Sequence, residues 1–303
     1  MEVARISVVI PTRNRPDQIG PCVEGVLANA HDSFEVVVAD QSDGADSEAA
    51  LAPYLHDSRL RYVRTATRGA GAARNVGIVA SKGELVLFTD DDCRVPKDWI
   101  SGMVHIFDTD PDVGVVFGRV DVPANAFDGG FLAAFLPVKR EYRRCFPQGL
   151  EPWGISANMG ARRKVLDEVG TFDALLGPGT KFIAGEDVDF AIRVLGTDWK
   201  VVNAEEVPLL HLGVRSGDGA RRLLLGYMFA TGTVFTKHVR LGTPGGWKLL
   251  ADFTSLHLNN IASSLRHGRR PTGIRQLASL LNGIVRSLPQ PIDRERKVYS
   301  VKA

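Results

Sequence analysis

Short apolar runs alternate with amphipathic stretches along the first ninety residues. The apolar runs lie at 6–10, 34–39, 60–63 and 85–88, and each has the length of a buried strand. A polar loop and a helical pattern separate each run from the next. Strands that alternate with helices in this way form parallel β-α units, with the helices packed on the sheet. The pattern therefore predicts an α/β fold with a Rossmann-like, mostly parallel central sheet flanked by helices.

Beyond this region the pattern changes twice. The stretch 121–152 has no clear periodicity and contains proline, glycine and clustered arginine and aromatic residues. Two short strands are then expected at 201–202 and 207–210, after a helix that begins near residue 186. The remainder contains three helical stretches, which we expect at 220–238, 246–266 and 272–286.

The distribution of charge divides the chain between residues 211 and 212, before the three helical stretches. The formal net charge is +2, but residues 212–303 carry 15 Lys/Arg against 4 Asp/Glu, whereas residues 1–211 carry 22 against 31. We therefore expect a domain boundary at residue 211. A basic helical extension follows. Such an extension can meet anionic lipid head groups or the acidic body of the protein, and no motif for nucleic acid accompanies it.

Composition excludes several other classes of protein. The three cysteines, Cys22, Cys93 and Cys145, are few, odd in number and not in metal-ligand spacing, so neither a disulfide framework nor a zinc site is expected. This favours a reducing cytoplasm, with peripheral contact at the inner face of the membrane as the remaining option. No signal peptide is expected, and no apolar run reaches the roughly 20 residues of a membrane-spanning helix.

Three adjacent carboxylates, Asp90, Asp91 and Asp92, follow directly on the apolar run that ends at Phe88. In open α/β sheets, ligands bind just outside the carboxyl ends of such buried strands. Carboxylate oxygens there can hold Mg²⁺ or Mn²⁺ against the phosphates of a substrate. The alternative is a solvated acidic turn that caps the helix starting near Pro96, and the triplet alone does not decide between them.

Two other segments carry candidate chemistry. The loop at 11–15 combines a threonine, an asparagine and two arginines between a strand and a helix, which suits an anionic ligand. A second acidic cluster, Glu186, Asp187 and Asp189, opens a later helix. The helix macrodipole favours carboxylates in a first turn, but three of them in four residues exceed what capping requires.

Taken together, these segments resemble the family 2 glycosyltransferases. The resemblance covers residues 5 to about 211 and depends on the order of several motifs, since each alone is weak. In chain order the motifs are 9–15, Asp40, 73–77, 88–92 with 95–99, Asn158, 170–173 and 185–190. The resemblance implies a GT-A fold and a hexosyltransferase type of enzyme that moves a sugar from a nucleotide-diphosphate donor with inversion at the anomeric carbon. It also implies that 1–211 is the catalytic domain, with a nucleotide-binding half (1–120) and an acceptor and catalytic half (121–211).

The resemblance also implies where the donor binds. Asp40, at a strand end, would recognise the N3–H of uracil or thymine, so UDP or dTDP donors are favoured. Arg74 would lie beside Asp40 or the phosphates. In the similar D-x-D motif the first carboxylate approaches the ribose and the last binds the metal; here the middle residue is also an aspartate. The predicted donor-binding residues are Pro11, Thr12, Arg13, Asn14, Arg15, Asp40, Arg74, Asp90 and Asp91.

Inverting transfer needs one base for the acceptor hydroxyl and one Lewis acid for the departing diphosphate. Asp187 matches the family's catalytic base, and Glu186 would bind acceptor hydroxyls or assist it. Asp92 is assigned to a Mn²⁺ or Mg²⁺ ion. His211 is either a second ligand of this ion or a structural histidine at a strand end. A retaining reaction would instead need a carboxylate nucleophile, and sequence spacing does not exclude one.

Two other functions compete with this hypothesis. A nucleotidyltransferase shares the nucleotide-binding half but normally carries a Gly-rich signature with a basic residue near the N-terminus, which the loop at 11–14 does not supply. A non-catalytic sugar-nucleotide-binding module would have eroded acidic motifs, and both are intact. The acceptor is left open as a glycan, a lipid-linked molecule or a small molecule. Acceptor choice is expected to lie in 121–152 and in the basic extension.

Overall fold

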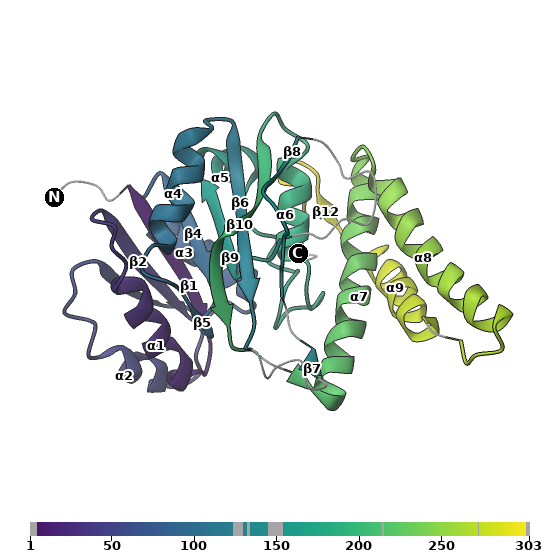
Figure 1. Cartoon of the computed structure of the whole chain (residues 1–303), viewed down its shortest axis with the longest axis horizontal. Helices are drawn as coiled ribbons and strands as arrows, with labels where there is room; N and C mark the ends of the chain where they lie inside the picture. Colours follow the sequence, from purple (N-terminus) through teal and green to yellow (C-terminus); the bar gives the residue numbers. More distant parts are fainter. Residues whose placement is uncertain are drawn as a thin grey trace.

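The computed structural model describes residues 5–123, 130–131, 134–144, 154–213, 215–271 and 273–300. Within these residues a nine-stranded sheet forms the centre of the molecule (Figure 1). Helices cover both faces of the sheet, and the C-terminal helices lie beside it, at the right of the view. Much of the stretch 121–152 lies outside the described residues.

The four N-terminal strands form the parallel half of the sheet that the sequence predicts. The strand order is β3-β2-β1-β4-β9-β6-β10-β5, with β8 paired to β10. Strands β1 to β4 are mutually parallel, whereas β9 runs antiparallel between β4 and β6. The strands of this sheet are β1 (Ile6–Thr12), β2 (Phe34–Asp40), β3 (Leu60–Arg64), β4 (Leu85–Thr89), β5 (Cys93–Arg94), β6 (Val113–Asp121), β8 (Glu141–Arg143), β9 (Asn158–Arg162) and β10 (Lys200–His211).

Two hydrophobic layers hold the sheet, because neighbouring side chains of each strand point to opposite faces. On β1, Val8 packs with α1 and α4 on one face, and Val9 packs with α3, α5 and α6 on the other. Every residue of β1 and β4 is buried, as expected of central strands covered on both faces. The helices of this part are α1 (Pro16–Leu27), α2 (Asp46–Leu51), α3 (Ala70–Ala80), α4 (Trp99–Thr109), α5 (Arg163–Val169) and α6 (Glu186–Val194).

The two short strands expected at 201–202 and 207–210 are one strand, β10. Its pairing with β6 shifts register between Ala204 and Pro208. A proline lacks the N–H that a ladder needs, so it is tolerated at a bulge. The sequence pattern breaks at this bulge although the strand continues through it to His211.

The C-terminal part consists of α7 (Gly217–Leu241), α8 (Gly246–Arg266), α9 (Ile274–Ser287) and two pairs of two-residue strands. These pairs are β7 (Gly130–Phe131) with β11 (Arg215–Ser216), and β12 (Ile292–Asp293) with β13 (Val298–Tyr299). Val234 and Phe235 of α7 join a third buried cluster with Phe182 and Ile192. Within the described part of the chain, no helix has the length and apolar character needed to cross a membrane. The boundary expected at residue 211 stays a prediction.

Candidate functional site

A cavity of about 610 Å³ lies where β1, β4 and β10 end, with α6 and α7 contributing to its walls. This is the edge at which open α/β sheets place their ligands. The cavity brings together the predicted catalytic and metal-binding residues and seven of the nine predicted donor-binding residues. The predicted residues that line it are Pro11, Thr12, Arg13, Arg15, Arg74, Asp90, Asp91, Asp92, Glu186, Asp187 and His211.

The acidic turn after β4 is fixed by basic and hydroxyl groups rather than by solvent. Asp91 accepts hydrogen bonds from Thr12 Oγ1 (2.8 Å) and from Arg15 Nη1 (2.7 Å). The same Arg15 nitrogen donates to Asp92 at 2.8 Å. Asp91 and Asp92 are buried, so the turn is not a solvated helix cap. Burial opposes ionisation of Asp92, but His211 and Arg15 outweigh it and lower its pKa to about 2.

Arg74 joins the two acidic clusters that the sequence places almost a hundred residues apart. Its guanidinium is buried and donates from Nη2 to Asp90 (2.6 Å) and from Nη1 to Glu186 (2.9 Å). Its Nε is buried without a hydrogen-bond partner among the described residues. Buried donors of this kind are costly when unpaired and suit an anionic ligand. The hydrogen bonds of the Arg74 guanidinium thus go to Asp90 and Glu186, and its predicted place beside Asp40 or the phosphates stays a prediction.

Asp187 is a carboxylate of the second cluster with a raised pKa. It accepts backbone N–H groups from Ser156 (3.2 Å) and Val188 (2.8 Å). Burial, reinforced by the neighbouring charge of Glu186, raises the pKa of Asp187 to about 7. A carboxylate with such a pKa can both accept and release a proton near neutral pH.

Asp189, two residues further along α6, has a different environment. Its Oδ1 lies 2.5 Å from Lys237 Nζ and 2.9 Å from His238 Nε2, and its Oδ2 lies 3.1 Å from Arg193 Nε. Burial opposes ionisation, but Lys237 and Arg193 outweigh it and hold the pKa of Asp189 well below its usual range. Lys237 also reaches Asp173 at 2.7 Å, so buried charges tie α7 both to α6 and to the segment that follows α5.

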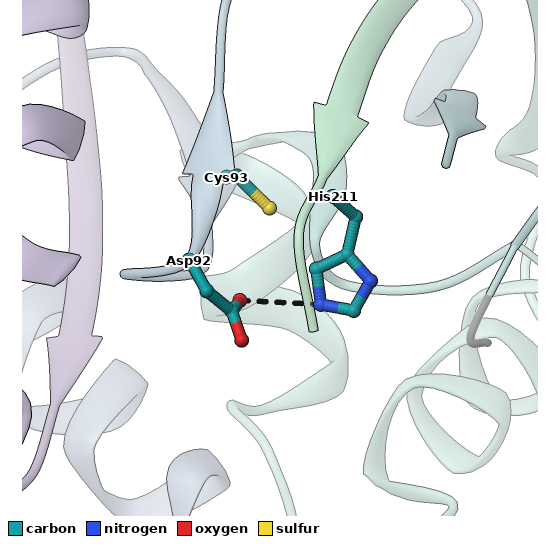
Figure 2. Close-up of side chains that lie close together, drawn as sticks. All are labelled: Asp92, Cys93 and His211. Carbon is teal, nitrogen blue, oxygen red and sulfur yellow. Dashed lines mark ion pairs between the residues drawn. The ribbon is translucent and has the colours of Figure 1, made fainter. Parts of the chain in front are cut away.

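A possible cation site lies at the end of β10. Asp92 Oδ1 and His211 Nε2 are 3.1 Å apart, and the thiol of Cys93 completes a group of ligand atoms within 4.8 Å of one another (Figure 2). Two neighbouring ligands of an octahedral ion at about 2.1 Å are separated by roughly 3 Å, so this pair fits one ion. A Cβ at Gly213 would lie 2.8 Å from Asp92 Oδ2 and 2.9 Å from His211 Nε2. Glycine therefore keeps space open beside both ligand atoms.

Two predicted donor-binding residues lie outside the cavity lining. Asp40 is fully buried, and its two oxygens accept hydrogen bonds from Tyr62 Oη and Ser42 N, both at 2.7 Å. Asn14 has a φ of +53° and bonds to the backbone and side chain of Asp43, which joins the loops after β1 and β2. Gln41, next to Asp40, lines the cavity instead.

One wall of the cavity was not foreseen from the sequence. It is mainly apolar and comes from α7 and α8, with Leu223, Tyr227, Ala230, Val234 and Phe253 as members. The apolar stripe of α7 was visible in the sequence, but its spacing does not tell which part of the molecule it covers. The backbone amide of Ser156 at Asp187 carries no signal in the sequence at all.

Comparison with known proteins places this geometry in context. The model of the family described as glycosyl transferase family 2 matches residues 7–170. Glycosyltransferase AglE of Haloferax volcanii is 26% identical over 207 residues, which cover 67% of this chain and 65% of that protein. Protein CgeD of Bacillus subtilis is 24% identical over 126 residues, which cover 39% and 30%. The chain thus spans less than two thirds of the length of these curated relatives.

Two solved structures share the fold at low sequence identity. The mannosyltransferase PcManGT of Pyrobaculum calidifontis, in complex with GDP-Man and Mn²⁺, superposes with a TM-score of 0.62 at 18% identity, covering 95% of this chain and 88% of that one. TarS 1-349 of S. aureus, in complex with UDP-GlcNAc, gives 0.60 at 16% identity, covering 97% and 84%. These likenesses confirm the predicted fold class.

Proposed function

This chain belongs to glycosyl transferase family 2, and from that premise we propose that it transfers a sugar from a nucleotide-diphosphate donor to an acceptor hydroxyl with inversion. The observation that carries the proposal is the meeting, in one cavity, of the Asp92–His211 pair and of Asp187. The pair suits a divalent cation, and Asp187 suits proton transfer near neutral pH. Single-displacement transfer needs these two functions together.

Each residue then has a defined task. The carboxylate of Asp187 accepts the proton of the acceptor hydroxyl as that oxygen attacks the anomeric carbon, and the bond to the diphosphate breaks. Glu186, held by Arg74, orients the acceptor or sustains the raised pKa of Asp187. Arg13, Arg15 and the free Nε of Arg74 supply cationic donors for the donor phosphates.

Asp92 and His211 would hold Mn²⁺ or Mg²⁺, which when bound supplies positive charge to the departing diphosphate. An imidazole ligand favours Mn²⁺, because Mg²⁺ prefers oxygen ligands. Asp90 and Asp91 would contact the donor, as the resemblance implies. The donors named for the two solved relatives, GDP-Man and UDP-GlcNAc, differ in base. We retain UDP or dTDP as the favoured donors; for Asp40 to read the base as predicted, the base would have to replace its hydrogen bond from Tyr62.

The acceptor is proposed to carry an apolar portion. The wall formed by Leu223, Tyr227 and Phe253 offers no charged side chain to a glycan, whereas it can pack against a lipid or another apolar group. Of the acceptors left open by the sequence, a lipid-linked molecule fits this wall best.

The test is a donor screen on the purified protein with Mn²⁺, in which release of nucleoside diphosphate is measured for UDP-, dTDP- and GDP-sugars. We expect one base to be strongly preferred, EDTA to abolish release, and added Mn²⁺ to restore it. NMR of the product should give the anomeric configuration opposite to that of the donor. Release of pyrophosphate would indicate a nucleotidyltransferase, and donor binding without release would indicate a binding module.

A further inference from the structure

The two outermost helices form a hairpin, residues 246–288, that is attached firmly to the molecule. Figure 1 shows α8 and α9 beyond α7, on the side away from the sheet. The backbones of α7 and α9 approach so closely that there is no room for a side chain at two glycines. A Cβ at Gly283 would lie 2.0 Å from Phe229 O, and one at Gly232 would lie 2.2 Å from Leu280 O. A hairpin fixed through glycines presents its outer faces in a constant orientation.

Those outer faces carry large apolar side chains. On α9 the exposed residues Ile274 (51%), Leu281 and Val285 (65%) follow one another at helical spacing, so they share one stripe. On α8, Trp247 (71%) and Leu265 (60%) lie eighteen residues apart, which again places them on one side of the helix. Exposed apolar stripes on two neighbouring helices indicate an interaction site.

The same hairpin is strongly basic. Its sequence contains six lysines and arginines and a single acid, Asp252, which gives a formal charge of +5. Asp252 is paired with Lys248 at 2.7 Å. Arg266, Arg269 and Arg270 are exposed around the end of α8, between Leu265 and Ile274. Apolar side chains flanked by exposed arginines are typical of segments that lie in a membrane interface.

Charge discriminates between the possible partners. In a symmetric dimer through this surface, two faces that each carry a formal charge of +5 would lie against each other, which is unfavourable. An anionic lipid surface complements them and also accepts the apolar side chains. We propose that the α8–α9 hairpin docks the protein on an anionic membrane, with Leu265 and Ile274 entering the interface and Arg266, Arg269 and Arg270 contacting lipid phosphates. This inference does not depend on the sugar-transfer proposal.

Co-sedimentation of the full-length protein with vesicles tests the electrostatic part. We expect binding to phosphatidylcholine vesicles containing 30% phosphatidylglycerol, little binding to pure phosphatidylcholine, and release at high salt. Arg269→Glu/Arg270→Glu should weaken the partition constant by at least about 30-fold, since each basic residue near such a surface contributes about fivefold. The matched control is Lys82→Glu/Lys164→Glu, which makes the same change in net charge on α5 and next to α3 and should retain most binding. Equal losses in both variants would overturn the proposal.

The apolar part needs a separate variant. Leu265→Ser/Ile274→Ser should also reduce vesicle binding at least tenfold, while Val79→Ser, at an 85% exposed position of α3, should not. Unchanged circular dichroism spectra verify that each variant is folded. Wild-type protein that ignores anionic vesicles would overturn the proposal. So would self-association in light scattering that Leu265→Ser/Ile274→Ser abolishes while vesicle binding persists, because the apolar face would then serve a second copy.

Discussion

Two acidic clusters, each with three carboxylates in a short segment, meet at the cavity but are neutralised differently. At the turn after β4, Asp91 and Asp92 share the guanidinium of Arg15, and Asp92 also faces His211. In the first turn of α6, Asp189 is surrounded by Lys237, His238 and Arg193, away from the cavity lining. Asp187 is instead held by backbone amides.

The difference separates carboxylates that stabilise the structure from those that can do chemistry. A buried carboxylate matched by cations stays ionised and is committed to its partners. Desolvation and the charge of Glu186 raise the pKa of Asp187 although its two amide donors lower it, so this carboxylate can exchange a proton. Asp187 and Asp189 differ in this way although two residues separate them. The predictions below test this contrast and then the one between the two clusters.

The largest effect is expected at Asp187. Asp187→Asn preserves shape but removes the base, so kcat should fall by about 10²–10⁴-fold. The melting temperature should fall only slightly, because the new side-chain oxygen still accepts one of the two amide bonds, and the bond that is lost can be the longer one, from Ser156. Steady-state assays of nucleoside diphosphate release provide the measurement. Release that continued unchanged would remove Asp187 from the base role.

Lys237→Met should have the opposite effect to Asp187→Asn, because it should mainly lower the stability of the protein. It leaves Asp173 and Asp189 buried with less compensating charge, which typically costs about 3–5 kcal/mol. Chemical denaturation monitored by tryptophan fluorescence gives the free energy of unfolding. Lys237→Met/Asp173→Asn should recover part of the loss, because Asp173 pairs with Lys237, whereas Asp189 keeps Arg193 and His238. A cost below about 1 kcal/mol would show that the network is not needed for stability.

The residues paired with Asp189 and Asp40 show which features of the structure can be predicted from the sequence. The parallel half of the sheet, the acidic turn at 90–92 and the helix beginning at 186 follow from local patterns, and the structure contains each of them. The link from Lys237 to Asp189 spans 48 residues and depends on how α7 packs, which apolar periodicity does not specify. For the same reason, the burial of Asp40 beneath Tyr62 could not be foreseen from its place at a strand end.

His211→Ala tests whether the cluster after β4 binds a cation through Asp92 and His211. If His211 is a ligand rather than a structural histidine, Mn²⁺ affinity should fall by about 10–100-fold, a range seen even when residues supporting a ligand are changed. Isothermal titration calorimetry of the EDTA-treated protein with Mn²⁺ gives the affinity directly. His211→Gln, which keeps a polar group of similar length, should lose a similar amount. Wild-type affinity in both variants would assign His211 a structural role.

The pH dependence of kcat/KM tests whether Asp187 accepts a proton in the reaction. With a pKa of about 7, Asp187 loses its base form as the pH falls, so kcat/KM should drop about tenfold per pH unit below 7 and level off above it. Glu186→Gln removes a neighbouring negative charge that raises this pKa, and the acidic limb should move to lower pH. An acidic limb that stayed at the same pH would show that the charge of Glu186 does not raise the pKa of Asp187.

The smallest effect is expected at Cys93, the third side chain of the possible cation site. Its thiol lies within 4.8 Å of the ligand atoms of Asp92 and His211, so proximity alone would make it a ligand. Hard cations such as Mn²⁺ and Mg²⁺ favour oxygen, whereas thiolates select softer metals. Cys93→Ala should therefore change Mn²⁺ affinity by less than about twofold in the titration used for His211→Ala. A loss as large as that in His211→Ala would mean that sulfur coordinates the ion, and a softer metal than Mn²⁺ would then have to be considered for this site.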